Sequence, residues 1–204
     1  FTDVGSARIL ADLPNHYGFY LGLTGKTIGP ADMVEAGIAH AFVPAARLSR
    51  LRPALVDATR QGGGDEDTLE SCLFQFDDRD EAGPGLLKPN AKKIKQCFSA
   101  SSVTDILSRL EALGEDEWAV QTLAKIRAAC PISVMVTFRH LCEAKGRDAR
   151  FTLERDFALA QKFLQSPHFY EGVRATLIDK DKNPIWQPDR LEALEDQDIE
   201  WYLS

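Results

Sequence analysis

The 204-residue sequence has no long apolar run and no excess of basic residues. Its apolar stretches are far shorter than the ~20 residues of a membrane-spanning helix, so we expect no membrane span and no signal peptide. A net charge of −7 and a pI near 5.1 leave no basic stripe to neutralise phosphates, which argues against a nucleic-acid partner. With 44% hydrophobic and 27% charged residues, the composition is that of an ordinary globular protein.

Cysteine is scarce, and its four occurrences are widely spaced: Cys72, Cys97, Cys130 and Cys142. None forms a C-x-x-C pair, and several lie among apolar residues at helical spacing. They are predicted to be reduced core residues, as in a cytosol-like compartment, rather than a disulfide framework or a zinc site.

The chain also lacks an initiating methionine, and its first segment, FTDVG, runs directly into a helical pattern. We therefore expect a fragment or a processed product of a longer protein. A targeting sequence of that protein would not be visible here.

The first helix is predicted over residues 4–13, capped by Thr2 or Asp3 and stopped by Pro14. An Asp before a helix is most often an N-cap that accepts a hydrogen bond from an amide of the next turn. The residues alone therefore favour a capping role for Asp3 over a catalytic one.

The next segments predict one short helix, one short strand and a bent helix. PADMVEAG (30–37) begins with Pro and ends with Gly, as a short helix does. IAHAFV (38–43) predicts a strand, and Pro44 then opens a helix bent at Pro53.

A glycine-rich loop, RQGGGDEDT, is predicted at residues 60–68, between two differently organised halves. The three glycines lack a following Lys-Ser/Thr pair, which makes a phosphate-binding loop improbable. The segment from there to about residue 90 is predicted to be irregular, with a second loop at DDRDEAGPG.

The rest of the chain predicts helices. Ser102 and Asp105 form a capping box before an apolar face that runs through Leu113. Further helices are predicted to Cys130, from Pro131 to Gly146, from Thr152 with the face Leu153, Phe157, Ala160 and Leu164, and a last one from Pro167 through Leu177. The expected fold class is mainly α with a minor β contribution.

Three further patterns favour structural roles. DKDKNP (179–184) resembles a calcium loop but has Pro184 where the turn needs Gly and Arg190 where a Glu is needed, so calcium is rejected. Glu171 and Arg174 are expected to form an ion pair across one helical turn. The histidines have no partner at a recognisable spacing and are interpreted as surface or satisfied core residues: His16, His40, His140 and His168.

The segment FTDVGSARILADLPNHYGFYLGLTGKTIGPADMVEAGIAHAFVP resembles the crotonase (enoyl-CoA hydratase/isomerase) superfamily. Within it, FTDVG and the long helical extension ending HFYEGVRATLIDKDKNPIWQP are most similar to the 3-hydroxyisobutyryl-CoA hydrolases. The resemblance covers the whole chain and implies two parts: residues 1–60 as the end of a crotonase-like α/β core, and residues 61–204 as a helical C-terminal domain. Thr2, usually Pro, and Ser6, usually Gly, depart from the pattern.

The resemblance implies hydrolysis of 3-hydroxyisobutyryl-CoA, a step of valine breakdown, with Asp3 as one of two catalytic carboxylates. The family's catalytic Glu precedes the Asp by about two helical turns' worth of residues, and the oxyanion-hole loop is earlier still. Neither is in this chain, so the 204 residues alone are expected to be inactive. No cofactor is implied, because the CoA thioester is the substrate.

In related CoA-binding members a basic residue near the end of the last helix meets the nucleotide phosphates, and the matching position here is Lys180. The alternative is that Lys180 and Lys182 are solvated surface charges. Expected partners are an acyl-CoA substrate, the missing N-terminal half and another copy in a homo-oligomer. The location is expected to be cytoplasmic for a bacterial protein and mitochondrial for a eukaryotic one.

Two other functions stay open at this point. One is an enoyl-CoA hydratase or isomerase on the same fold. The other is a non-catalytic helical interaction or oligomerisation module, with apolar faces meant for the absent half or for a second subunit.

Overall fold

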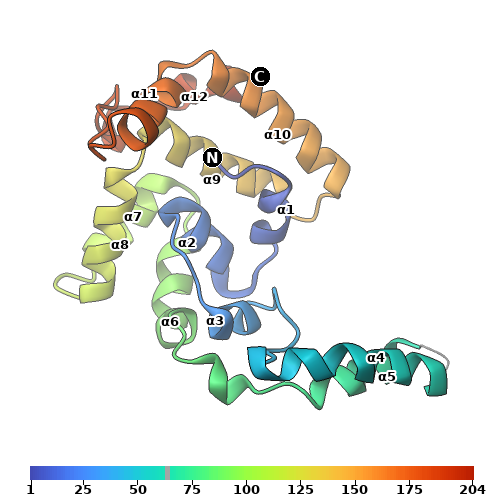
Figure 1. The fold of residues 1–204 in the computed structure, drawn as a ribbon. Helices are drawn as coiled ribbons and strands as arrows, with labels where there is room; N and C mark the ends of the chain where they lie inside the picture. The colour runs from blue at the N-terminus through green and yellow to red at the C-terminus, as the bar shows by residue number, and fades with distance from the viewer. Residues whose placement is uncertain (63–64) are drawn as a thin grey trace. The chain divides into compact units, whose positions relative to one another are not determined.

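The computed structural model describes residues 1–62 and 65–204, and the regular elements in these ranges are all helical (Figure 1). The chain divides into two compact units, one made of residues 1–26 and 91–204 and the other of residues 27–90. The predicted boundary at residue 60, between the end of a longer core and a helical domain, stays a prediction.

The larger unit begins with two short helices and continues with the helices of the C-terminal part. Their bounds are α1 (Ser6–Ala11), η1 (Pro14–His16), α2 (Tyr17–Thr24), α6 (Leu87–Phe98, which starts in the other unit), α7 (Val103–Glu111), α8 (Glu117–Ala128), α9 (Pro131–Ala144), α10 (Ala149–Leu164), α11 (Pro167–Val173), η4 (Arg174–Ile178), η5 (Leu191–Ala193) and α12 (Asp196–Leu203).

Helix α9 is the centre of this unit, because α1, α2 and α12 all pack against it. One buried cluster joins α9, α10 and α12 through Val136, Leu159, Phe163, Ile199 and Tyr202. A second joins α1 to α9 through Ala7, Ala11, Leu141 and Ala144. The N-terminal segment is thus held on the C-terminal helices of the same unit.

Local sequence explains several helix ends. The Ser102 hydroxyl accepts a hydrogen bond from the Asp105 amide at 3.1 Å and caps α7, as predicted. Pro131 occupies the first position of α9, and Gly146 follows that helix with φ 68°. Asp148 then caps α10, so this helix begins three residues before the predicted Thr152.

The predicted apolar face of α10 is wrong by one residue. Leu153, Phe157 and Leu164 are more than half exposed, whereas the helix buries Thr152, Asp156, Leu159 and Phe163. Both sets have helical spacing. The predicted set is the more apolar one, whereas the buried set includes the polar residues Thr152 and Asp156.

The smaller unit contains α3 (Pro30–Glu35), η2 (Ala45–Arg47), α4 (Leu48–Gly62), α5 (Glu66–Phe74) and η3 (Arg79–Ala82). Helix α3 has the predicted Pro start, and α4 contains Pro53. The predicted loop at 60–68 is shorter than expected, because α4 continues to Gly62 and Asp65 caps α5. Gly63 and Gly64 lie outside the described residues, so part of the rejected phosphate loop is not described.

The predicted strand at residues 38–43 does not form, and no strand occurs in the described parts of the chain. A strand needs a neighbour for its backbone groups. Here the Phe42 amide donates to the Asp77 carboxylate at 2.8 Å, and the Phe42 carbonyl accepts from the Asp78 amide at 2.8 Å. Residues 77–78 therefore satisfy the two backbone groups of Phe42, which a neighbouring strand would otherwise have paired.

Within the described residues, no single helix combines the length and apolar character needed to cross a membrane. By length and composition alone, only α8 and α9 taken together meet that requirement, and they are bent by 107° at their junction.

Candidate functional site

Asp3 lies in a tight turn that we call the Asp3 turn, residues 2–6. Its carbonyl accepts a hydrogen bond from the Ser6 amide at 2.9 Å, and its side chain is exposed. The predicted capping role is wrong, because α1 begins at Ser6 with Gly5 in the N-cap position and no side chain caps it. The Asp3 carboxylate therefore does not cap α1.

The residue after Asp3 has a strained backbone. Val4 has φ 49°, a left-handed conformation that β-branched residues rarely adopt, and its side chain is 84% exposed. Gly5 follows with φ 79°, which costs a glycine little. Since burial of Val4 does not compensate for this strain, contacts elsewhere must hold the turn in place.

Those contacts come from α9 and α10. The Gly5 amide donates to Asp156 Oδ2 at 2.6 Å, and the Thr2 hydroxyl lies 3.2 Å from His140 Nδ1. His140 is fully buried and Asp156 is nearly so, and His140 Nε2 lies 3.3 Å from Asp156 Oδ1. Residues on both sides of Asp3 are thus tied to one buried His–Asp pair.

The protonation of His140 follows from its neighbours. Burial lowers its pKa, while the nearby carboxylates of Asp156 and Glu143 act in the opposite direction. The tautomer of the ring decides whether His140 Nδ1 or the Thr2 hydroxyl is the donor of their 3.2 Å contact. The 3.3 Å contact is too poorly aligned for a full hydrogen bond, and neither of its two atoms has another partner among the described residues.

A hollow of about 360 Å³ adjoins the same segment. Apolar residues and a few hydroxyl groups line it, among them Phe1, Thr2, Leu21, Ser133, Val134 and Thr137. Its walls come from the N-terminal segment, α2, α9 and the end of α8, which are all parts of the larger unit. Asp3 itself is not among the lining residues.

Lys180 lies in a different setting, the loop that we call the Arg174 loop, residues 179–185. Arg174 Nη1 donates to Asp179 at 2.6 Å and to Asp181 at 2.7 Å, and its Nη2 donates to Glu171 at 2.8 Å. Glu171 Oε1 also accepts from the Ile185 amide at 2.6 Å. The predicted Glu171–Arg174 ion pair is confirmed and is the centre of a larger network.

The acidic residues of DKDKNP are accounted for by their pairing with the Arg174 guanidinium. Their carboxylates already face the guanidinium, and no group of three His, Cys, Asp or Glu residues in the described ranges could hold a metal ion. The Arg174 side chain lowers the pKa of Glu171 to about 2. Lys180 is exposed with φ 57° between the two acids, and within the described ranges it makes no contact with Asp3.

The remaining predicted residues are the histidines and the cysteines, and one of them lies at the Asp3 turn. His140 is the histidine that contacts the Asp3 turn; none of the other three is recorded in contact with it within the described ranges. Cys97 and Cys130 are buried as predicted, but Cys142 is exposed, and all four cysteines are free.

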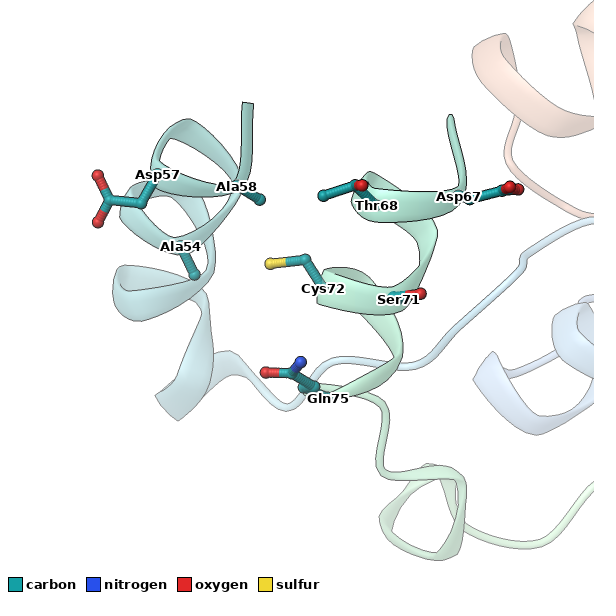
Figure 2. Close-up of a pocket in the computed structure, with 8 residues that line it drawn as sticks. All are labelled: Ala54, Asp57, Ala58, Asp67, Thr68, Ser71, Cys72 and Gln75. Atoms are coloured by element: carbon teal, nitrogen blue, oxygen red, sulfur yellow. The ribbon is translucent and has the colours of Figure 1, made fainter. Parts of the chain in front are cut away.

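The smaller unit has its own hollow, of about 670 Å³, between α4 and α5. Figure 2 shows that the Asp57 and Asp67 carboxylates point away from the space between the helices, whereas Ala58 and Cys72 point into it. The described residues that line the gap therefore bring no charged groups together and form no catalytic constellation.

Comparison with known proteins places the whole chain in one group. The sequence profile of the family described as Enoyl-CoA hydratase/isomerase matches residues 1–203. The 3-hydroxyisobutyryl-CoA hydrolase, mitochondrial, of Dictyostelium discoideum is 34% identical over 205 residues, which cover 100% of this chain and 53% of that protein.

Two solved structures have the same fold. A carnitinyl-CoA dehydratase from Mycobacterium thermoresistibile has a TM-score of 0.82 and 26% identity, over 99% of this chain and 55% of that one. An enoyl-CoA hydratase from Rhodobacter sphaeroides has a TM-score of 0.80 and 30% identity, with the same coverage. The chain spans about half the length of the relatives it matches. Over that span, from Phe1 to Leu203, it belongs to the enoyl-CoA hydratase/isomerase family, as the resemblance in its sequence predicts.

Proposed function

We propose that this chain is the C-terminal part of a CoA-thioester hydrolase that cleaves 3-hydroxyisobutyryl-CoA to 3-hydroxyisobutyrate and CoA. The observation that carries the proposal is the similarity to a hydrolase of that name along the entire chain, including the helical extension after residue 60. The relative's name also includes the word mitochondrial, which supports a mitochondrial location if the source is a eukaryote.

Asp3 is the carboxylate of this chain that we assign to the reaction. Thioester hydrolysis needs a nucleophile at the carbonyl carbon, donors for the developing oxyanion, and departure of the CoA thiolate as the C–S bond breaks. The exposed Asp3 side chain is available to orient the substrate hydroxyl or the attacking water. A second carboxylate and the oxyanion-hole amides would come from the other half of the intact protein.

Lys180 is proposed to contact the CoA phosphates. The helix predicted through Leu177 is α11 followed by the π-helical turn η4, which ends at Ile178. The network around Arg174 fixes the backbone on either side of Lys180, so an exposed ammonium group is held just after η4. The flanking acids Asp179 and Asp181 would repel a phosphate if they were free, but Arg174 pairs with both.

The intact protein of which this chain is a part provides the test. Release of free CoA from 3-hydroxyisobutyryl-CoA is measured beside hydration of crotonyl-CoA, with Asp3→Asn as the variant. We expect hydrolysis to dominate and Asp3→Asn to lower kcat by at least about 100-fold. The 204 residues alone should release no CoA, and turnover by them would contradict the proposal.

Enoyl-CoA hydratase activity is the second candidate, favoured by the 30% identity to a solved enoyl-CoA hydratase. Preference of the intact protein for crotonyl-CoA in the same pair of assays would establish it in place of the hydrolase.

A role in assembly is the third candidate, and it rests on the exposed face of α10. Leu153, Phe157 and Leu164 are between 51% and 66% exposed, and Ile9 on α1 is 53% exposed. We propose that the missing half or a second copy covers them. An intact protein that sediments as a monomer with these side chains accessible would argue against it.

A further inference from the structure

We propose that the buried His140–Asp156 pair is a positioning device for Asp3, acting through the backbone and hydroxyl groups that flank it. This inference rests on the proposed catalytic role of Asp3 and concerns how that carboxylate is held. Neither residue touches the carboxylate itself.

The argument begins with the connectivity around the turn. The Thr2 hydroxyl contacts His140, the His140 ring faces Asp156, and Asp156 accepts from the Gly5 amide at 2.6 Å. Covalent bonds from Thr2 through Asp3 to Gly5 close this chain of contacts into a ring. The Asp3 Cα is therefore tied on both sides to the same pair.

Burial makes the tie rigid. His140 is 0% exposed and Asp156 6%, and they project from different helices, α9 and α10. A buried polar oxygen is costly unless it has a hydrogen-bond partner. The Gly5 amide is the hydrogen-bond donor for Oδ2, so the turn and the pair stabilise each other.

The strained backbone of the Asp3 turn needs such a restraint to keep its shape. Val4 has φ 49° and is 84% exposed, so neither its conformational preference nor its packing keeps the turn in this shape. Without the bond at Gly5, the backbone is expected to relax toward φ < 0. A catalytic group displaced by about 1 Å can lose about 100-fold in rate.

The test is a double-mutant cycle in the intact protein with 3-hydroxyisobutyryl-CoA. Asp156→Leu removes the acceptor for Gly5 and should lower kcat about 10- to 100-fold with little change in KM. Asp156→Asn keeps an oxygen for Gly5 and should recover most of that loss. Glu154→Gln, at a mostly exposed residue of the same helix, is the matched control and should have no effect.

The Asp3→Asn background separates positioning from general scaffolding. If Asp156 acts through Asp3, Asp156→Leu causes no further loss of kcat once Asp3 is Asn. An equal loss in both backgrounds would overturn the inference. So would normal kcat for Asp156→Leu when Asp3→Asn is impaired, and in that case the proposed function stands.

Full activity of Asp3→Asn would overturn the proposed function and this inference together. If Asp156→Leu does not fold, Thr2→Val gives the same cycle, because it removes only the hydroxyl that contacts His140. The expected loss is then smaller, and again it should disappear in the Asp3→Asn background.

Discussion

The Asp3 turn and the Arg174 loop both present an exposed charged residue, but they are held in opposite ways. The Arg174 loop is fixed by residues within fifteen positions of one another, from Glu171 to Ile185. The Asp3 turn depends on contacts 138 and 151 residues away in sequence. One shape is therefore set by local charge pairing, and the other exists only when α9 and α10 are packed beneath it.

The largest expected effect comes from a pair of glycines near the two regions: Gly18 in α2, which packs against α1, and Gly172 in α11, before the Arg174 loop. In Gly18→Ala the new Cβ would lie 1.6 Å from the Leu10 carbonyl oxygen, so α2 must move away from α1. We expect a loss of about 3 kcal/mol in unfolding free energy. Gly172→Ala, near the Arg174 loop, makes only an ordinary contact with Trp186 at 3.6 Å and should stabilise its helix by about 0.5–1 kcal/mol.

Chemical denaturation of the chain measures both variants. A Gly18→Ala variant as stable as the parent chain would show that α1 does not need its close approach to α2.

Acid should act next most strongly, and on the region that holds the Asp3 turn. Burial lowers the pKa of His140 below its ordinary 6.5, with Asp156 and Glu143 opposing this shift and Arg155 adding to it. The unfolded chain then binds a proton near pH 6.5 that the folded chain binds only at lower pH. The contribution of the neutral His140 to the free energy of unfolding is therefore present above about pH 6.5. It decreases as the pH falls from there toward the pKa of His140 in the folded chain.

Burial also lowers the pKa values of His16 and His168, so the decrease includes them. Denaturation at pH 7.5, 6.5 and 5.5 should show it, and His140→Gln should reduce the slope. An unchanged slope in His140→Gln would mean that another group causes the acid sensitivity.

Removing backbone strain should have a smaller effect. Asn tolerates a left-handed backbone better than a β-branched residue, and Val4 buries little. Val4→Asn is expected to stabilise the chain by about 1 kcal/mol. Val4→Ile keeps the branched side chain and serves as the control with no gain. Equal stability of the two variants would show that φ 49° carries no strain here.

The smallest effect on global stability is expected in the Arg174 loop, because exposed ion pairs contribute little to the free energy of unfolding. Arg174→Met should instead loosen the loop locally, since Asp179, Asp181 and Glu171 would then repel one another. Hydrogen exchange should become faster at residues 181–185 while the Gly5 amide stays protected. Faster exchange at both places would mean that the two regions are not independent.

The parts of the fold that sequence predicted are those with local causes. Ser102, Pro131 and Gly146 each act within one helical turn, and each marks a helix end where expected. The capping box of α12, formed by Glu195 and Asp198, had the same kind of pattern and was overlooked. The strand at 38–43 failed because a strand depends on a partner elsewhere in the chain.

In the candidate site, too, local contacts were predictable from the sequence and contacts between distant residues were not. The Glu171–Arg174 pair was predictable from its spacing, whereas the capping role of Asp3 was wrong because tertiary contacts to Thr2 and Gly5 decide the shape of that turn. A sequence signal for Asp156 did exist, since it continues the spacing of Thr152, Leu159 and Phe163. An acid on the buried stripe of a helix needs a polar partner, but nothing in the sequence identifies Gly5 as that partner.

The bond between the Gly5 amide and Asp156 has a consequence for the order of biosynthesis. With 151 residues between its ends and a ribosome adding about 5–20 residues per second, roughly 8–30 s pass before the second partner is made. A nascent polypeptide that stops before α10 lacks Asp156, so the Gly5 amide has no acceptor there and the Asp3 turn keeps only its contacts with α9. A stop codon before the codon for Asp156 would therefore remove the acceptor of the Gly5 amide and leave the Asp3 turn without this contact.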